Sequence, residues 1–308
     1  MLNKKKVNVG NETVRTVRLW MADILFAALI VAGTITPARQ AAAQTSASGL
    51  RLYVFNCGTL IYNNPETYNL TRQEVKNTNM SVNCYLIVHP RGTLLFDTGL
   101  PDKMLGLPFN ETTLNGQPNP PSTSYFVLVM KTLKSQLAEI GYPPKKIDYL
   151  ALSHSHADHV GNANDYAGST WLAQKAEYDF MFGPNVPAQS INPNYQALKN
   201  SKVQMFLGDH DVFGDGTVVL KYTPGHTPGH QSLYVKLPKT GAVVISGDLY
   251  HYPEERTLGR MPEREKSLET PASRAALDAF MKDKKAELWI EHDITRSSKQ
   301  RKSPEYYD

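Results

Sequence analysis

The stretch His154-Ser155-His156-Ala157-Asp158-His159 places four potential metal ligands within six residues. It directly follows a short apolar run, residues 149–153, which is typical of a buried β-strand. On an extended loop alternate side chains project to the same side, so the first two histidines can address one position. After the chain turns, Asp158 and His159 can address a neighbouring position. Imidazole and carboxylate groups suit zinc and similar first-row ions, so the stretch predicts a metal site.

Three further ligand candidates follow other predicted strands. His226 lies just beyond a strand, within Thr223-Pro224-Gly225-His226-Thr227-Pro228-Gly229-His230. Asp248 ends the apolar run 243–248, and His292 follows the run 288–290. The ends of strands from separate parts of the chain can converge at one edge of a fold. We therefore expect these side chains to meet those of residues 154–159.

The rest of the sequence predicts a domain of strands interrupted by helices. Apolar residues at helical spacing predict one helix over 126–140, and Thr270-Pro271 predicts the start of another that ends near Lys282. Residues 101–123, rich in Pro, Asn and Gly, predict a long loop. Further strands are expected at 51–57, 82–88, 93–96, 203–207, 218–222, 231–237 and 242–246. The order is typical of an α/β domain with mixed sheets, and no linker divides residues 44–308.

The N-terminus has the composition of an export signal. Basic residues precede the apolar run 24–33, and the small residues Ala41, Ala42 and Ala43 follow it. This order predicts a signal peptide over 1–43 and a mature domain over 44–308, located in the periplasm or secreted. The alternative is an uncleaved membrane anchor, although the apolar run is short for a span of about 20 residues.

Charge and cysteine content exclude several classes of protein. Residues 1–43 carry six of the 33 basic and two of the 29 acidic residues, which leaves 27 of each. A balanced mature chain does not favour nucleic acid as a partner or stable membrane association after cleavage. Two cysteines exclude a disulfide-rich scaffold and a four-cysteine zinc module. Cys84 fits a core position, and in an oxidising compartment pairing with Cys57 is also open.

The ordered pattern H-x-H-x-D-H, then a distant His, an Asp and a His, resembles the metallo-β-lactamase superfamily. Over residues 50–308 the resemblance implies a four-layer αββα sandwich, an α+β fold of two mixed β-sheets flanked by helices, with a metal site at one edge. It implies two divalent ions, zinc in the first place, with iron, cobalt or manganese as alternatives. The implied ligands are His154, His156 and His226 for one ion, Asp158, His159 and His292 for the other, and Asp248 as the bridge.

Within the superfamily, three segments resemble bacterial N-acyl-homoserine lactonases. They are residues 84–86 followed by 95–99, residues 222–233 and residues 291–294, the last with the sequence Glu-His-Asp-Ile. The resemblance implies a quorum-quenching hydrolase in which a metal-bridging hydroxide opens the ring of a small lactone. Asp248, or a water that it holds, would return the proton to the leaving oxygen.

One position departs from the lactonase pattern. Some of these enzymes place a Tyr three residues after the bridging Asp, where this chain has His251, with Tyr250 beside it. Either side chain is a candidate donor to the substrate carbonyl, and the alternative is that both only line the strand end.

Two other residues near the motifs have expected roles. Asp97 is expected either to hold a ligand histidine or to form a turn before Gly99. His230 is expected to be a structural hydrogen-bonding residue, not a ligand.

The substrate is the most open part of the prediction. An aryl-ester or organophosphate hydrolase, a thioesterase and a β-lactamase need the same metals, since a fold does not choose a substrate. A metal-binding protein without turnover is the alternative outside the enzymes. An acyl tail would need an apolar wall, for which the 101–126 segment offers Leu105, Leu107, Phe109, Tyr125 and Phe126. The oligomeric state is not encoded in any motif, and a homodimer stays open.

Overall fold

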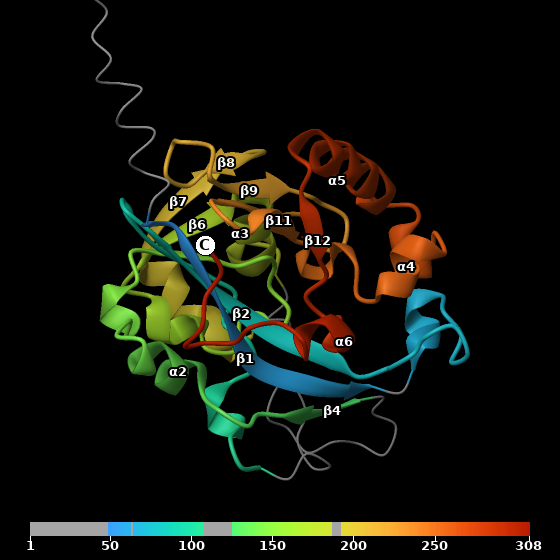
Figure 1. Ribbon diagram of the computed structural model, residues 1–308, viewed down its shortest axis with the longest axis horizontal. Helices are drawn as coiled ribbons and strands as arrows, with labels where there is room; N and C mark the ends of the chain where they lie inside the picture. The colour runs from blue at the N-terminus through green and yellow to red at the C-terminus, as the bar shows by residue number, and fades with distance from the viewer. Residues whose placement is uncertain (1–48, 63, 108–124, 187–191) are drawn as a thin grey trace, which may run out of the picture. The chain divides into compact units, whose positions relative to one another are not determined.

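Two mixed β-sheets form the centre of the fold (Figure 1). The computed structural model describes residues 49–62, 64–107, 125–186 and 192–308, all within the unit Ala38–Asp308. The predicted signal peptide over 1–43 lies outside the described residues, and so does most of the predicted loop over 101–123. In the described part of the chain one sheet has seven strands and the other has five.

The seven-stranded sheet has the order β4-β1-β2-β3-β5-β6-β7. Its strands are β1 (Arg51–Tyr62), β2 (Met80–His89), β3 (Gly92–Phe96), β4 (Tyr125–Leu128), β5 (Tyr149–Ala151), β6 (Thr170–Gln174) and β7 (Lys202–Phe206). The pairs from β4 to β3 are antiparallel, and those from β3 to β7 are parallel. The sheet is therefore mixed, as the sequence predicted.

The five-stranded sheet has the order β12-β11-β10-β9-β8. Its strands are β8 (His210–Asp211), β9 (Val218–Tyr222), β10 (Gln231–Leu237), β11 (Gly241–Ile245) and β12 (Glu287–Trp289). Only the β11–β12 pair is parallel among the pairs described in this sheet. The α-helices are α2 (Leu133–Glu139), α3 (Lys175–Phe182), α4 (Pro253–Thr257), α5 (Thr270–Lys284) and α6 (Ile294–Ser297).

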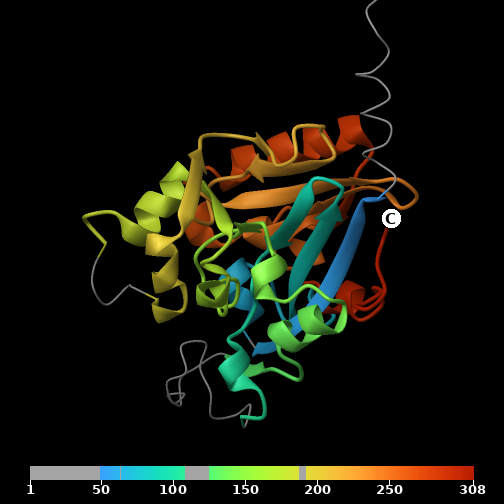
Figure 2. The ribbon, with the colours of Figure 1, turned by 90° about the vertical axis from the view of Figure 1, so that its left-hand side faces the viewer.

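Three apolar clusters hold four layers together. Leu52 and Val54 of β1 face the five-stranded sheet, where they join Val235 and Ile245 in one buried cluster. The alternate residues of β1 face the other way and pack with helix α2. A third cluster lies between α5 and the outer face of the five-stranded sheet. Figure 2 shows this succession, with α5 on one side of the two sheets and α2 on the other. The predicted αββα sandwich is confirmed.

The helix predicted over 126–140 is wrong in its first part. Residues 125–128 form strand β4, because the long strand β1 offers them a partner, with Phe126 opposite Ile61. The helix begins only at Leu133, after Thr132 accepts a hydrogen bond from the Ser135 amide and so caps it. Strand β6 and helix α3 were not predicted, because residues 170–182 show no clear periodicity.

The two cysteines join the first two strands. Cys57 in β1 and Cys84 in β2 form a disulfide, which settles the open pairing. The bond lies against Gly99, where an added Cβ would come within 2.2 Å of the Cys57 Cβ. The disulfide therefore packs against the segment that follows β3.

None of the helices in the described residues combines the length and apolar character that crossing a membrane requires.

Candidate metal centre

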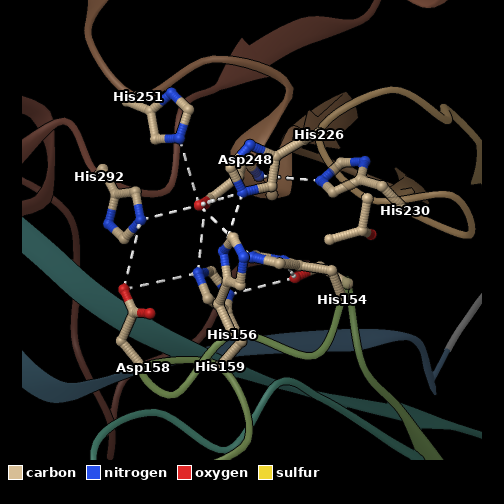
Figure 3. Close-up of polar contacts among 12 residues, drawn as sticks. His154, His156, Asp158, His159, His226, His230, Asp248, His251 and His292 are labelled. Carbon is tan, nitrogen blue, oxygen red and sulfur yellow. Dashed lines mark hydrogen bonds and ion pairs between the residues drawn. The ribbon is translucent and has the colours of Figure 1, made fainter. Parts of the chain in front are cut away.

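Strand ends from both sheets bring the predicted ligands together. His154 follows β5 of the seven-stranded sheet, and His226 lies in the loop between β9 and β10 of the other sheet. Asp248 and His292 follow the neighbouring parallel strands β11 and β12. The carboxyl ends of parallel strands meet at one edge, which explains why residues so far apart in sequence converge. Figure 3 shows the resulting cluster around Asp248.

The first cluster consists of His154, His156, His226 and Asp248, whose candidate ligand atoms all lie within 4.8 Å of one another. The Nε2 atoms of His154 and His226 lie 3.5 and 3.3 Å from Oδ2 of Asp248. His226 Nε2 is also 3.0 Å from His156 Nδ1. Three imidazoles and one carboxylate oxygen thus face a common point, as in a four-ligand ion site.

The second cluster consists of Asp158, His159 and His292. The Nε2 atoms of His159 and His292 lie 3.2 and 3.0 Å from Oδ1 of Asp248 (Figure 3). Oδ2 of Asp158 is 3.6 Å from His292 Nε2 and 3.7 Å from His159 Nε2. One oxygen of Asp248 therefore faces each cluster, which is the arrangement that a bridging carboxylate requires.

The donor set fits cations. Within the part of the chain that the structure describes, Nε2 of His154, Nε2 of His159 and Oδ1 of Asp248 are buried and have no hydrogen-bond partner. Buried polar atoms without partners cost free energy, so such atoms at one place indicate a site that fits a cation. Nitrogen and carboxylate ligands suit zinc and other divalent first-row ions. The roles of the seven residues as ligands stay predictions.

Burial and neighbouring charges set the protonation of the cluster. Burial opposes the ionisation of Asp248, yet the imidazoles of His292 and His159 hold the pKa of Asp248 well below its usual range. Burial, together with His226, lowers the pKa of His156 to about 3, and burial with His159 lowers that of His154. Burial opposes the protonation of His159 and His226, yet carboxylates, with Asp248 first among them, raise the pKa of both imidazoles. Metal binding requires neutral imidazoles and an ionised carboxylate, so an ion would displace a proton from these two histidines.

Carboxylates and carbonyls hold the outer nitrogens of several of these histidines. His159 Nδ1 lies 2.9 Å from Oδ2 of Asp97, and His292 Nδ1 donates to the Ser81 carbonyl at 2.8 Å. Asp97 also accepts from the Ser153 amide at 2.6 Å and has a φ of 59°. Asp97 therefore holds a histidine, which supports the first of its two expected roles, and its left-handed backbone lies directly after β3.

Three buried carboxyl groups near the cluster had no role in the sequence prediction, although Glu291 lies in the segment 291–294 that resembles the lactonases. Glu265 lies 2.9 Å from His226 Nδ1, and Glu177 accepts from the Thr227 hydroxyl at 2.7 Å and the Gly229 amide at 3.0 Å. Glu291 joins Asp97 and His159 in a third set of potential ligands. Burial and the nearby Asp97 raise the pKa of Glu291 well above its usual range. No spacing signal links these residues to the histidines that they approach.

The structure separates His251 from Tyr250. His251 lies at the cluster, with Nε2 3.3 Å from Oδ2 of Asp248 and Nδ1 3.3 Å from Oε2 of Glu255. Tyr250 packs on the other side, under the Arg274 guanidinium at 4.2 Å, within the apolar cluster of α5. Only His251 is thus placed to contact a molecule bound at Asp248. The catalytic role of His251 stays a prediction.

His230 has the hydrogen bonds of a structural residue. Its Nε2 accepts from the Asp248 amide at 2.9 Å, and its Nδ1 donates to the Thr223 carbonyl at 3.0 Å. Both ring nitrogens are occupied, which agrees with the expectation.

Of the residues proposed to form the wall of an acyl groove, Leu105 and Leu107 are about half exposed. Phe109 and the Tyr125 side chain lie outside the described residues.

The fold and the paired clusters define a class of protein that the family comparison identifies. The model of the metallo-beta-lactamase superfamily matches residues 77–288. This range covers more than half of the chain and includes every predicted ligand except His292. The chain belongs to the metallo-beta-lactamase superfamily, and the resemblance seen in the sequence is confirmed.

The relatives with known names that resemble this chain include N-acyl homoserine lactonases of the same superfamily. The N-acyl homoserine lactonase AiiA of Bacillus thuringiensis subsp. kurstaki is 31% identical over 241 residues, which cover 75% of this chain and 88% of AiiA. The N-acyl homoserine lactonase AttM of Rhizobium radiobacter is 27% identical over 271 residues, 84% of this chain and 98% of AttM. A solved N-acyl homoserine lactone hydrolase, with N-hexanoyl-L-homoserine bound at its catalytic metal centre, matches with a TM-score of 0.66 and 27% identity, over 83% of this chain and 98% of that one.

Proposed function

We propose that this protein is a dinuclear metal-dependent hydrolase that opens the lactone ring of N-acyl homoserine lactones. The observation that carries the proposal is the division of the Asp248 carboxylate between two clusters of imidazoles at the edge of an αββα sandwich. The similarity to lactonases over most of the chain supports the lactone as substrate. The product is the ring-opened N-acyl-homoserine, and the reaction would silence a diffusible signal.

Bound divalent ions would polarise the ester carbonyl and lower the pKa of a water molecule. The chain itself supplies the remaining functions. Asp248 lies where it can hold the proton that the water loses and return it to the ring oxygen as the ring opens. His251 is held at Nδ1 by Glu255, so its Nε2 is oriented toward Asp248, where we propose that the substrate carbonyl binds. A hydrogen bond from Nε2 would stabilise the charge that develops on this oxygen.

We propose zinc as the native metal, two ions per chain, with iron, cobalt and manganese as alternatives. The mixed nitrogen and carboxylate ligands of both clusters support this choice. Elemental analysis of the purified protein would give the identity and number of the ions. At most one ion per chain in fully active protein would contradict the dinuclear centre.

A substrate panel on the metal-loaded protein tests the function. It should compare N-acyl homoserine lactones of several acyl lengths with simple lactones, phosphotriesters, thioesters and a β-lactam. We expect ring opening of the acyl homoserine lactones, followed by acid release, to have the highest kcat/KM. Rapid hydrolysis of a phosphotriester or thioester without lactone opening would refute the lactonase and leave a different dinuclear hydrolase. No turnover of any substrate would favour a metal-binding protein.

We also propose that the protein is exported to the periplasm or secreted, without stable membrane association after cleavage. The order of basic, apolar and small residues within 1–43 supports export. The disulfide between Cys57 and Cys84 gives independent support, because such bonds persist mainly in oxidising compartments.

A further inference from the structure

The imidazole of His226 uses its two nitrogens for different contacts. Nε2 faces the first cluster, 3.0 Å from His156 Nδ1 and 3.3 Å from Oδ2 of Asp248. Nδ1 points the other way and lies 2.9 Å from Oε1 of Glu265. Glu265 is fully buried, so water does not compete for this contact. A Nδ1–H that donates to Glu265 leaves the Nε2 lone pair directed into the cluster.

Glu265 is itself fixed by the start of helix α5. Its other oxygen, Oε2, accepts a hydrogen bond from the hydroxyl of Thr270 at 3.1 Å, and Thr270 is also fully buried. The guanidinium of Arg264 is 3.7 Å from Oε1, but its side chain is about two-thirds exposed, so water screens this pair. One oxygen of the Glu265 carboxylate thus contacts α5, and the other contacts His226.

The loop that carries His226 packs tightly on the same part of α5. Ser273 donates to the Pro224 carbonyl at 2.6 Å. At Gly225, with a φ of 134°, an added Cβ would lie 2.2 to 2.7 Å from atoms of Thr270. The backbone of the loop therefore lies directly against the first turn of α5. This contact fixes the distance between His226 and Glu265.

We propose that Glu265 is a positioning residue that sets the affinity of the first cluster for its ion by holding the His226 imidazole in one tautomer and orientation. The inference rests on the proposed dinuclear centre. Among the described residues, Glu265 plays for His226 the part that Asp97 plays for His159 in the second cluster. Each cluster would then contain one imidazole that a carboxylate supports. Such outer partners typically change metal affinity by about 10- to 100-fold.

The test measures Zn²⁺ binding by the full-length protein in metal-buffered equilibrium dialysis, with Zn²⁺ alone as the probe. We expect Glu265→Gln, which keeps the shape and removes the charge, to weaken one of the two ions at least about tenfold. The other ion should stay within twofold of the wild type. Glu263→Gln is the matched control, because Glu263 lies in the same short 3-10 helix with a side chain that is 80% exposed. It should change neither ion.

A variant of Asp97 tests whether the loss of a supporting carboxylate weakens only the ion in its own cluster. Asp97→Asn should weaken the other ion, and the Glu265→Gln/Asp97→Asn double variant should weaken both. If both single variants weaken the same ion, the double variant will keep one tight ion, and the inference is wrong. Equal weakening of both ions by Glu265→Gln, or of neither, also overturns it.

A second variant covers the case in which Glu265→Gln does not fold, which circular dichroism would reveal. Thr270→Val keeps the volume and removes only the hydroxyl that fixes Glu265, so we expect a smaller weakening of the same single ion. No change in Zn²⁺ binding by a folded Thr270→Val would then overturn the inference. Because the readout is ion binding, a protein that shows these effects but opens no lactone would refute the proposed substrate alone.

Discussion

Asp248 connects the two clusters, because each of its oxygens faces a different set of imidazoles. Asp248→Asn keeps the shape but removes the charge that we propose to bridge two ions and the base that we propose to return a proton. We expect kcat for lactone opening to fall by at least about a hundredfold, the lower end of a typical acid–base contribution. Metal content should be measured on the same samples. Asp165→Asn, on the exposed surface, is the control. A variant with two ions and wild-type kcat would contradict this role.

The proposed role of His251 is to polarise the substrate carbonyl. We expect His251→Phe to lower kcat/KM for an acyl homoserine lactone roughly tenfold or more, which equals about 1.4 kcal/mol of transition-state stabilisation. Tyr250→Phe should have little effect, because Tyr250 packs against Arg274 on the other side. Steady-state kinetics of both variants would decide between them. A damaging Tyr250→Phe beside a harmless His251→Phe would reverse the assignment.

His230 makes stability depend on pH. Burial, with a contribution from the nearby His226, lowers the pKa of His230 to about 3, whereas an unfolded His has a pKa of about 6.5. A lowered pKa means that the unfolded chain binds the proton first. We therefore expect His230 to stabilise the fold fully above pH about 6.5, and to lose this contribution by about 1.4 kcal/mol per pH unit as the pH falls from about 6.5 toward about 3.

The comparison with His230→Gln isolates this effect from other titrating groups. The glutamine amide can accept from the Asp248 amide in place of Nε2, but it does not titrate. Urea unfolding at pH 7 and 4.5 should show a smaller loss of unfolding free energy for the variant than for the wild type. Equal losses would mean that His230 is not the titrating group.

At the scale of elements, the loop between β9 and β10 holds His226 only while it stays packed on α5. Gly225→Ala would place a Cβ against Thr270 and force a φ of 134° on an alanine. We expect the loop to shift and the first ion to be lost or weakened at least about tenfold, since ligand orientation controls affinity. Elemental analysis after dialysis measures this. Gly168→Ala is the control, because an added Cβ there meets nothing within 4 Å.

The element scale also shows where reading of periodicity fails. Apolar residues from Phe126 onward fit a helix, yet the first of them belong to β4, because pairing with β1 satisfies their backbone. A strand of four residues gives too short a signal to compete with a helical pattern beside it. The partner strand lies more than sixty residues earlier, so only the tertiary structure shows it.

At the scale of the whole molecule, export is the main expectation. If residues 1–43 form a signal peptide, N-terminal sequencing of the exported protein should begin near Gln44, and thiol titration should find no free cysteine. A cell fraction assay would show the protein in the periplasm or medium. A protein that still begins at Met1 and remains in the membrane would show that the segment is an anchor.

The sequence alone determined the superfamily, the layered fold and the set of predicted ligands. It could do so because ligands that follow strand ends leave short local patterns, such as residues 154–159 and 223–230. The cysteine pair, in contrast, stayed open until the pairing of β1 with β2 placed Cys57 beside Cys84.

Only the tertiary structure decided which groups support the ligands and which neighbour of Asp248 faces them. Glu265 and Asp97 contact histidines 39 and 62 residues away in sequence, and no local pattern encodes such distances. After Asp248 the chain leaves a short 3-10 helix and becomes extended at Tyr250, so Tyr250 and His251 point in opposite directions. The direction of that alternation depends on a turn at Gly247, with a φ of 52°, which packing against His230 and Ser153 fixes.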